Sequence, residues 1–128
     1  LVPHVESAAF TEATGALAAE RALSGIRPET AVIAGNDLSA LGALDVLDGR
    51  DLTVPDDVSL VGYDNTFVAA LRHIALTTVD QHRERLGELA VEALIERVEH
   101  GRTEARHVVI PPELVVRETT APPRSIRP

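Results

Sequence analysis

The chain has 128 residues, which suits one domain with a buried core, and 45% of its residues are hydrophobic while 25% are charged. It contains no cysteine, which excludes disulfides and thiolate chemistry, and its formal net charge of -8 does not by itself attract nucleic acid or an anionic membrane. No apolar run approaches the roughly 20 residues of a membrane-spanning helix.

The patterns along the chain alternate between extended and helical segments. In chain order they predict a weak strand (1–5), a helix (12–23), a buried strand (30–34), a helix (38–47), a buried strand (58–63), one or two helical turns (66–72), an extended segment (75–79), a helix (83–99) and two strands (107–110 and 114–117). The strands are continuously apolar, which is typical of a parallel sheet covered on both faces. The sequence therefore predicts an α/β fold.

Capping residues support two of the helices. Thr11 is suited to cap the first helix, and Asn36 or Asp37 is suited to cap the second, which ends at Gly49. Asn36-Asp37 and Asp64-Asn65 each follow a predicted strand directly. Because ligands of such sheets sit beyond the carboxyl ends of the strands, we expect both pairs at one binding edge.

Few catalytic or metal-binding patterns are present. The five histidines show no metal-ligand spacing, and no serine elbow, phosphate loop or dinucleotide fingerprint occurs. We therefore expect no enzyme activity, no metal site and no cofactor. The Pro55-Asp56-Asp57 sequence is most simply a solvated turn.

Two residues near predicted strand ends, Phe10 and Asp64, each have two possible roles. Phe10 is one of only three aromatic residues in the sequence. Phe10 precedes the first helix, where it could pack as a hydrophobic staple or offer a stacking face to a ring-shaped ligand. Asp64 ends the stretch Val-Gly-Tyr-Asp, where it could cap the segment 66–72 or present a carboxylate to a ligand. The local pattern leaves both alternatives open.

Four stretches carry a family resemblance: AVIAGNDLSALGALDVL, LTVPDDVSLVGYDN, LTTVDQHRERLGELAVEALIERV and VVIPPELVVRET. Their order and spacing resemble the C-terminal part of a LacI/GalR-family transcriptional regulator over residues 10–120. The resemblance implies a three-layer, parallel-sheet lobe of the periplasmic-binding-protein-like type I fold, with the N-terminal lobe largely missing. No methionine occurs, even at position 1, so we expect the chain to begin inside a longer protein or to have been processed.

The same resemblance divides the chain. Residues 1–76 would belong to the C-terminal lobe, residues 77–112 to a crossover, helix and strand of the N-terminal lobe, and residues 113–120 to a strand that returns. Residues 121–128, rich in proline and arginine, are expected to form a disordered tail.

By resemblance, three residues would contact an effector held between two lobes. Phe10 would stack on the effector, Asn36 would contact its hydroxyl groups, and Asp64 would accept hydrogen bonds from its hydroxyl or ring N–H groups. Gly62 would allow the backbone to pack closely at the end of this strand. Four apolar residues would face a second copy in a homodimer: Leu41, Phe67, Val68 and Leu71.

The function implied is the effector-binding and dimerising part of a bacterial, cytoplasmic DNA-binding regulator, such as a repressor. The effector would be a small sugar or a nucleoside-like or purine-like ligand, and operator DNA would be bound only through a helix-turn-helix before residue 1. The alternative is a secreted sugar-binding protein of a transport system, although the N-terminus lacks a signal-peptide pattern.

The helix over 83–99 has a wide apolar stripe that the rest of this chain is not expected to cover. The stripe recurs at three- and four-residue steps: Leu86, Leu89, Ala90, Ala93, Leu94 and Val98. Leaving it in water forgoes several kcal/mol at about 25 cal/mol per Å². We expect this helix to be exchanged with a second copy rather than folded back onto its own sheet.

Overall fold

A computed structural model describes residues 3–25 and 29–123. Its elements in chain order are α1 (Glu12–Ala22), β1 (Ala31–Ile33), α2 (Asp37–Asp48), β2 (Ser59–Tyr63), β3 (Thr77–Asp80), α3 (Arg83–Glu99) and β4 (Glu113–Val115). They form one four-stranded sheet in the order β1-β2-β3-β4, with β1, β2 and β3 parallel and β4 antiparallel to β3. The predicted α/β fold with a parallel sheet is confirmed.

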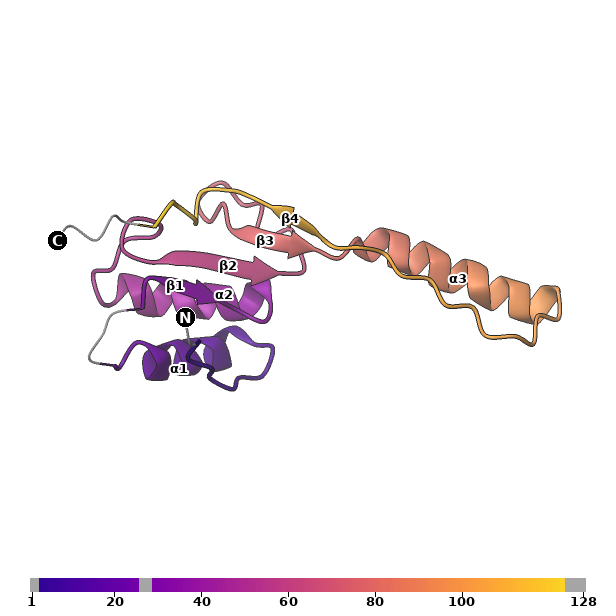
Figure 1. The fold of residues 1–128 in the computed structure, drawn as a ribbon, viewed down its shortest axis with the longest axis horizontal. Coiled ribbons are helices and arrows are strands. Elements are labelled where there is room, and N and C mark those ends of the chain that lie inside the picture. The colour runs from indigo at the N-terminus through magenta and orange to yellow at the C-terminus, as the bar shows by residue number, and fades with distance from the viewer. Residues whose placement is uncertain (1–2, 26–28, 124–128) are drawn as a thin grey trace.

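The two N-terminal helices are stacked on one side of the sheet. Helix α2 packs against β2, and α1 packs against the outer side of α2 (Figure 1). Glycines permit this close approach: a Cβ on Gly15 would lie 2.5 Å from Ser39 Cα, and a Cβ on Gly42 would lie 2.0 Å from the Glu12 carbonyl oxygen. The α1–α2 interface therefore depends on two residues without side chains.

The hydrophobic core lies between α2 and the sheet and extends to Ala19 on α1. Its buried cluster is made of small and branched apolar side chains: Ala19, Ala40, Ala43, Leu60, Ala69 and Leu76. The return segment after β4 closes this core at the amino ends of the strands, because Leu60 N donates to Thr119 O at 2.7 Å and Thr119 Oγ1 donates to Leu60 O at 2.7 Å.

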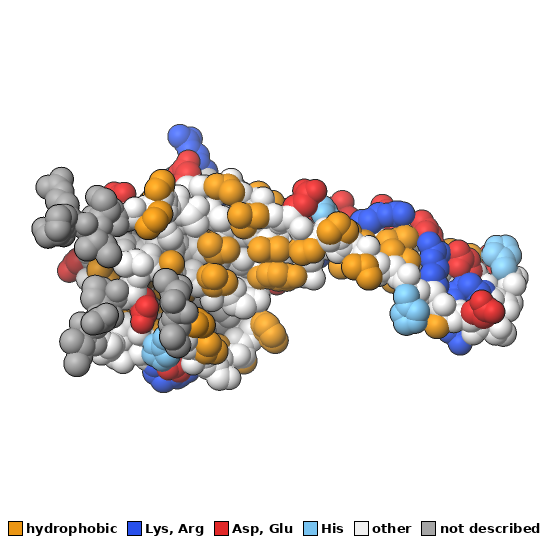
Figure 2. Space-filling view, in the orientation of Figure 1, with side chains coloured by type: hydrophobic (Ala, Val, Ile, Leu, Met, Phe, Trp, Pro, Cys, Tyr) orange, Lys and Arg blue, Asp and Glu red, His pale blue; other side chains and the backbone are white. Residues whose placement is uncertain are grey.

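The opposite face of the sheet is apolar and exposed. The strand registers place the following side chains on that face: Ile33, Val61, Tyr63, Val79 and Leu114. Ile33 is 83% exposed, and Leu114 is exposed as well. Figure 2 shows the hydrophobic side chains gathered over the strands. The second covering layer expected from the apolar strands is not supplied by any helix among residues 3–25 and 29–123.

Helix α3 leaves the body at the end of β3, and the chain returns beside it to β4 (Figure 1). We call residues 83–112 the arm. The predicted bounds of this helix, 83–99, agree with the structure, and no residue of α3 is buried. Arg106 Nη1 lies 2.8 Å from Glu96 Oε1, and Arg102 Nη2 donates to Ala93 O at 2.9 Å, so polar contacts hold the return segment on the helix.

Three smaller predictions are corrected. Residues 107–110 are not a strand, because no strand among the described residues pairs with them, and Val109 is 90% exposed. Residues 3–5 are not a strand either, and residues 1–2 lie outside the described residues, as do residues 124–128 of the predicted tail.

The segment 66–72 forms tight turns closed by bonds such as Ala69 N to Thr66 O at 3.1 Å, rather than regular helix. None of the described helices is both long enough and apolar enough to cross a membrane.

Candidate functional site

The carboxyl ends of β1, β2 and β3 lie at the edge of the sheet from which the arm leaves (Figure 1). Polar residues follow each strand: Asn36 and Asp37 come after β1, Asp64 and Asn65 after β2, and Gln81 after β3. Parallel sheets bind ligands at such an edge. The prediction that the first two pairs meet at one edge is confirmed.

Asn36 lies at this edge, but its amide is already occupied by the protein. Its Oδ1 caps α2 by accepting from Ser39 N at 2.9 Å, and its Nδ2 donates to Phe10 O at 3.2 Å. The residue is only 8% exposed. In this structure Asn36 therefore starts the helix and holds the segment before α1 against it.

Phe10 is held at the edge by that bond and presents its ring outward. Phe10 is 71% exposed, and its Cε1 lies 3.9 Å from the position of a Cβ built on Gly35. A hydrophobic staple would need an apolar side chain at the fourth helical position, which here is Gly15. The staple alternative therefore lacks its usual partner.

Asp64 follows β2 with a positive φ of 105°, and Asn65 has a φ of 48°. Asp64 N donates to Val79 O at 2.9 Å, and Gln81 Nε2 donates to Asp64 Oδ1 at 2.7 Å. No donor from the described ranges 3–25 and 29–123 reaches the second carboxylate oxygen, Oδ2. Asp64 thus has an acceptor atom that remains open at the edge.

The pKa of the Asp64 carboxyl is raised. Partial burial is the largest cause, and the negative charge of Asp37 adds to it. The positive charge of Arg83 and the hydrogen bond from Gln81 act in the opposite direction and are weaker. Burial and the neighbouring charge of Asp37 therefore disfavour the charged form of Asp64.

Asp37 is buried directly behind Asp64. Its Oδ2 accepts from Thr66 N at 2.6 Å and from Thr66 Oγ1 at 2.8 Å, and its Oδ1 accepts from Thr78 Oγ1 at 2.6 Å. A Cβ on Gly62 would lie 2.5 Å from Asp37 Oδ1 and 2.8 Å from Leu76 Cδ2. Gly62 is therefore closely packed, but the atoms nearest to it belong to the side chains of Asp37 and Leu76 rather than to the backbone that we expected there.

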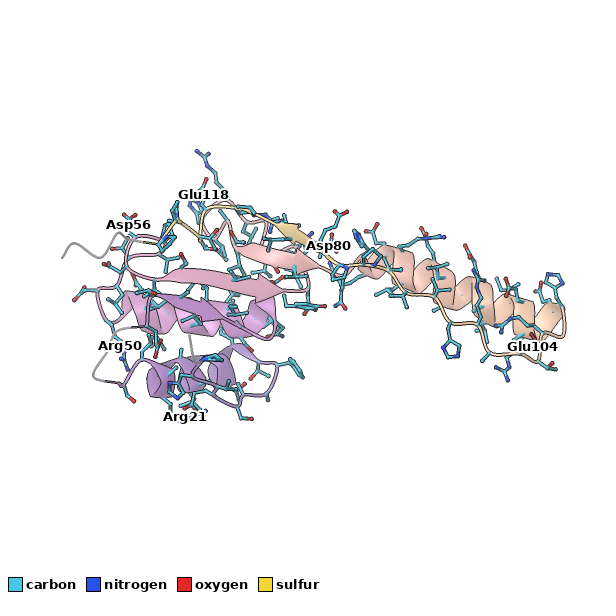
Figure 3. The ribbon with its side chains drawn as sticks, in the orientation of Figure 1. Arg21, Arg50, Asp56, Asp80, Glu104 and Glu118 are labelled. Carbon is cyan, nitrogen blue, oxygen red and sulfur yellow. The ribbon has the colours of Figure 1, made fainter. Side chains whose placement is uncertain are left out.

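Asn65 joins the loop after β2 to β3 and to the segment that follows β4. Its Nδ2 donates to Asp80 Oδ2 at 3.0 Å, and its Oδ1 accepts from Arg117 Nη2 at 2.7 Å. Arg117 Nη1 also donates to Leu76 O at 2.7 Å. Figure 3 places Asp80 at the junction between the body and the arm.

The bonds at the junction also lower the pKa of the Asp80 carboxyl. The hydrogen bond from Asn65 is the largest cause of a lowered pKa of Asp80, followed by the bond from the His82 backbone N–H. The carboxylate of Asp80 is therefore stabilised in its charged form, whereas that of Asp64 is destabilised.

The four residues predicted for a dimer surface occupy α2 and the turns after Asp64. Phe67 and Leu71 are exposed, and Leu41 and Val68 are partly buried. The Asp37–Thr66 bonds hold these two segments together. Leu41 is not among the partly buried side chains that pack against the described core cluster.

No three His, Asp or Glu side chains in the described part of the chain come together as a metal site. Two shallow hollows lie away from the strand-end edge. One is beside residues 7–9 and α1, and the other is at the end of α2 near Leu52. Neither hollow is lined by any of the strand-end residues Asn36, Asp37, Asp64, Asn65 and Gln81.

A family model described as the periplasmic binding protein-like domain matches residues 2–120. The chain belongs to this family. Two curated relatives of this periplasmic binding protein-like chain are named HTH-type transcriptional repressor PurR. The protein from Edwardsiella ictaluri is 38% identical over 112 residues, and the one from Escherichia coli O1:K1 / APEC is 39% identical over 112 residues. Each match covers 88% of this chain and 33% of the relative, so the chain spans about one third of their length.

Solved structures of transcriptional regulators share the fold. A complex of the transcriptional regulator CelR with cellobiose has a TM-score of 0.82 at 35% identity, covering 88% of this chain and 34% of that chain. A LacI regulator from a Rhodococcus species has a TM-score of 0.84 at 36% identity, covering 90% and 42%. A LacI-family regulator from Enterococcus faecalis V583 with bound ribose has a TM-score of 0.84 at 27% identity, covering 92% and 43%. The predicted resemblance to a LacI/GalR-family effector domain is confirmed.

Sequence reasoning missed several residues of the edge. The sequence predicts Asp37 as a possible helix cap and as part of the edge but gives it no role at the site, and it does not indicate Gln81, Arg83 or Arg117 as site residues. Gln81 follows β3 just as Asp64 follows β2, so the rule that ligands meet strand ends could have found it. Arg117 joins the site from the distant segment that follows β4, and no local pattern indicates that contact.

Proposed function

We propose that this chain is the effector-binding and dimerising part of a transcriptional regulator. The observation that carries the proposal is Asp64: its carboxylate lies at the strand-end edge, one oxygen is held by Gln81, and the other oxygen has no donor within the described residues. The family membership and the regulator relatives support the same function.

The chemistry of the edge suits a small ligand with hydroxyl or ring N–H groups. A carboxylate accepts two hydrogen bonds from such groups and orients them. The exposed ring of Phe10 supplies an apolar stacking face near Asn36. Bound cellobiose and ribose in structural neighbours support a sugar, and a nucleoside-like or purine-like ligand is the second class that this edge suits.

Asn36 contributes to the proposed site in one of two ways. Its amide would turn toward the effector only by giving up the bond to Phe10 or the cap of α2. We favour an indirect contribution, in which Asn36 holds Phe10 in place.

The remaining parts of the proposal concern the whole protein. Residues 1–76 and 113–120 would form the C-terminal lobe, residues 77–112 would pack in the N-terminal lobe, and residues 121–128 would form a tail. The exposed arm and the open face of the sheet support this division, because both have apolar surface against which the polypeptide of the N-terminal lobe would pack. Operator DNA would be bound by a helix-turn-helix outside this chain, and the regulator would be a cytoplasmic homodimer.

A secreted sugar-binding protein of a transport system would use the same ligand chemistry. The curated relatives are repressors, which favours the regulator. We propose no enzyme activity, because the curated relatives are repressors and not enzymes.

Calorimetric titration of the full-length protein with cellobiose, D-ribose and adenosine tests the proposal. Asp64→Ala should weaken binding of the recognised probe about tenfold to a hundredfold, because a charged hydrogen-bond partner is worth about 1.5–3 kcal/mol. Phe10→Ala should weaken it similarly. Asp45→Ala, at an exposed carboxylate on α2, is the matched control and should change affinity less than about twofold. Unchanged affinity in Asp64→Ala would remove Asp64 from the site.

A further inference from the structure

We infer that Asp37 is a positioning residue for the effector site: its buried carboxylate holds Thr66 and Thr78 so that the loop after β2 presents Asp64 at the strand-end edge. This inference rests on the proposed function for the role of Asp64, but the contacts that carry it are within the described chain.

Asp37 is more buried than a helix-starting acid needs to be. It is the first residue of α2, where a negative charge interacts favourably with the helix dipole even when exposed. Here it is 1% exposed, and the cap of the helix is supplied by Asn36 instead. A buried charge is retained only when it is paired or fully hydrogen-bonded, so the burial of Asp37 indicates a tertiary role.

That role is to join three elements through both oxygens. Oδ2 takes the backbone N–H and the hydroxyl of Thr66, which follows β2, and Oδ1 takes the hydroxyl of Thr78, which lies in β3. Bonds of 2.6–2.8 Å to a carboxylate are short and strong. The amino end of α2, the loop after β2 and the middle of β3 are therefore held together at one buried group.

The loop that is held in this way has a costly backbone conformation. Asp64 and Asn65 are two consecutive non-glycine residues with positive φ, at 105° and 48°. Such conformations persist only where the surroundings hold them. Asp64 is fixed on one side by its N–H bond to Val79 O, and the loop is fixed on the other side by Thr66 on Asp37. Asp37 thus supplies the anchor that directly follows the strained pair.

An asparagine cannot replace this group. The carboxylate accepts from three donors, whereas an amide offers one oxygen and brings two N–H donors of its own. Asp37→Asn keeps the size but leaves Thr66 or Thr78 without its acceptor. It also removes a negative charge that faces Asp64, while the opposing charge of Arg83 remains.

The experiment compares Asp37→Asn with Asp45→Asn, which removes an equal charge from an exposed position on the same helix. NMR of the protein without ligand follows the Thr66 amide and the titration of the Asp64 carboxyl. In Asp37→Asn the Thr66 amide proton should move upfield, and the pKa of Asp64 should fall, because both the loop contact and the neighbouring charge are lost. In Asp45→Asn both should stay as in the parent. A folded Asp37→Asn variant with both signals unchanged overturns the inference.

Calorimetry with cellobiose, D-ribose and adenosine supplies the second measurement. The probe that binds the full-length parent should lose about tenfold or more in affinity in Asp37→Asn, and less than about twofold in Asp45→Asn. Equal losses in the two variants overturn the inference. If no probe binds the parent, the proposed effector class has failed, and the NMR comparison still decides the role of Asp37.

A pair of variants at Thr66 covers the case in which Asp37→Asn does not fold. Thr66→Val removes only the hydroxyl that donates to Asp37, and Thr66→Ser keeps it. The valine variant should change the pKa of Asp64 and weaken probe binding severalfold. The serine variant should keep the pKa and the affinity of the parent. The same result for valine and serine overturns the inference.

Discussion

Gln81 Nε2 donates a 2.7 Å hydrogen bond to Asp64 Oδ1, and this bond joins the residue after β3 to the residue after β2. The bond leaves Asp64 Oδ2 at the strand-end edge. It also links Asp64 to the strand that continues into the arm. A ligand bound at Asp64 would therefore act on the connection between the body and the arm.

Asp64→Asn should stabilise the fold at neutral pH. Because the pKa of Asp64 is raised in the folded chain, ionisation disfavours folding: the penalty is absent below the unfolded pKa of about 3.9 and is complete above the higher folded pKa. Asparagine keeps an acceptor for Gln81 and cannot ionise. Urea unfolding should show a larger gain for Asp64→Asn at pH 7 than at pH 3. A gain that does not vary with pH would contradict this prediction.

Arg117→Ala should destabilise the fold by about 1–3 kcal/mol, because Asn65 Oδ1 and Leu76 O would each lose a charged donor. Arg72→Ala removes the same charge from an exposed position and should change the free energy of unfolding by less than about 0.5 kcal/mol. Denaturant unfolding of both variants provides the comparison, and equal effects would show that the Arg117 contacts contribute nothing.

Gly42→Ala and Gly87→Ala should act in opposite directions. A Cβ on Gly42 would overlap the Glu12 carbonyl of α1, so we expect a loss of about 1–3 kcal/mol in the free energy of unfolding. Nothing lies within 4 Å of a Cβ on Gly87 in α3, so alanine should stabilise that helix by about 0.5–1 kcal/mol. Amide exchange measures the local effect in α3. If Gly87→Ala is also destabilising, α3 is packed at Gly87 against another polypeptide segment, such as a second copy of the chain.

Leu41→Asp should dissociate the proposed dimer of the full-length protein. A carboxylate there would be buried between copies without a partner. Sedimentation at micromolar concentration measures the association, and Leu17→Asp, an exposed apolar position on α1, is the control. If Leu41→Asp remains dimeric, the predicted surface of Leu41, Phe67, Val68 and Leu71 is wrong.

The 128-residue chain should self-associate through the arm, as the predicted exchange of α3 requires. Leu94 and Val98 are exposed on α3, so Leu94→Glu with Val98→Glu should make sedimentation independent of concentration. Ile33→Glu tests the open face of the sheet in the same way. If only Ile33→Glu abolishes association, the contact is the sheet and not the arm.

Local patterns alone predicted much of this fold. The 3.6-residue period of apolar positions predicted helix 83–99 with its observed bounds, and the capping chemistry of Thr11 and Asn36 predicted the starts of α1 and α2. The continuously apolar runs predicted a parallel sheet, and the position of Asp64 directly after one of them placed it at the carboxyl-end edge of that sheet. Each of these features depends on residues that are close together in the sequence.

Tertiary structure alone decided which polar groups at that edge are already bonded. Asn36 uses its amide within the protein, Asp37 is buried behind the loop, and Arg117 reaches Asn65 from the segment after β4, 52 residues later in the chain. The same holds for residues 107–110, whose apolar pattern suits a strand but which have no pairing strand among the described residues. Hydrogen bonds of this kind join residues far apart in the sequence, so the residues of one segment cannot indicate their partners.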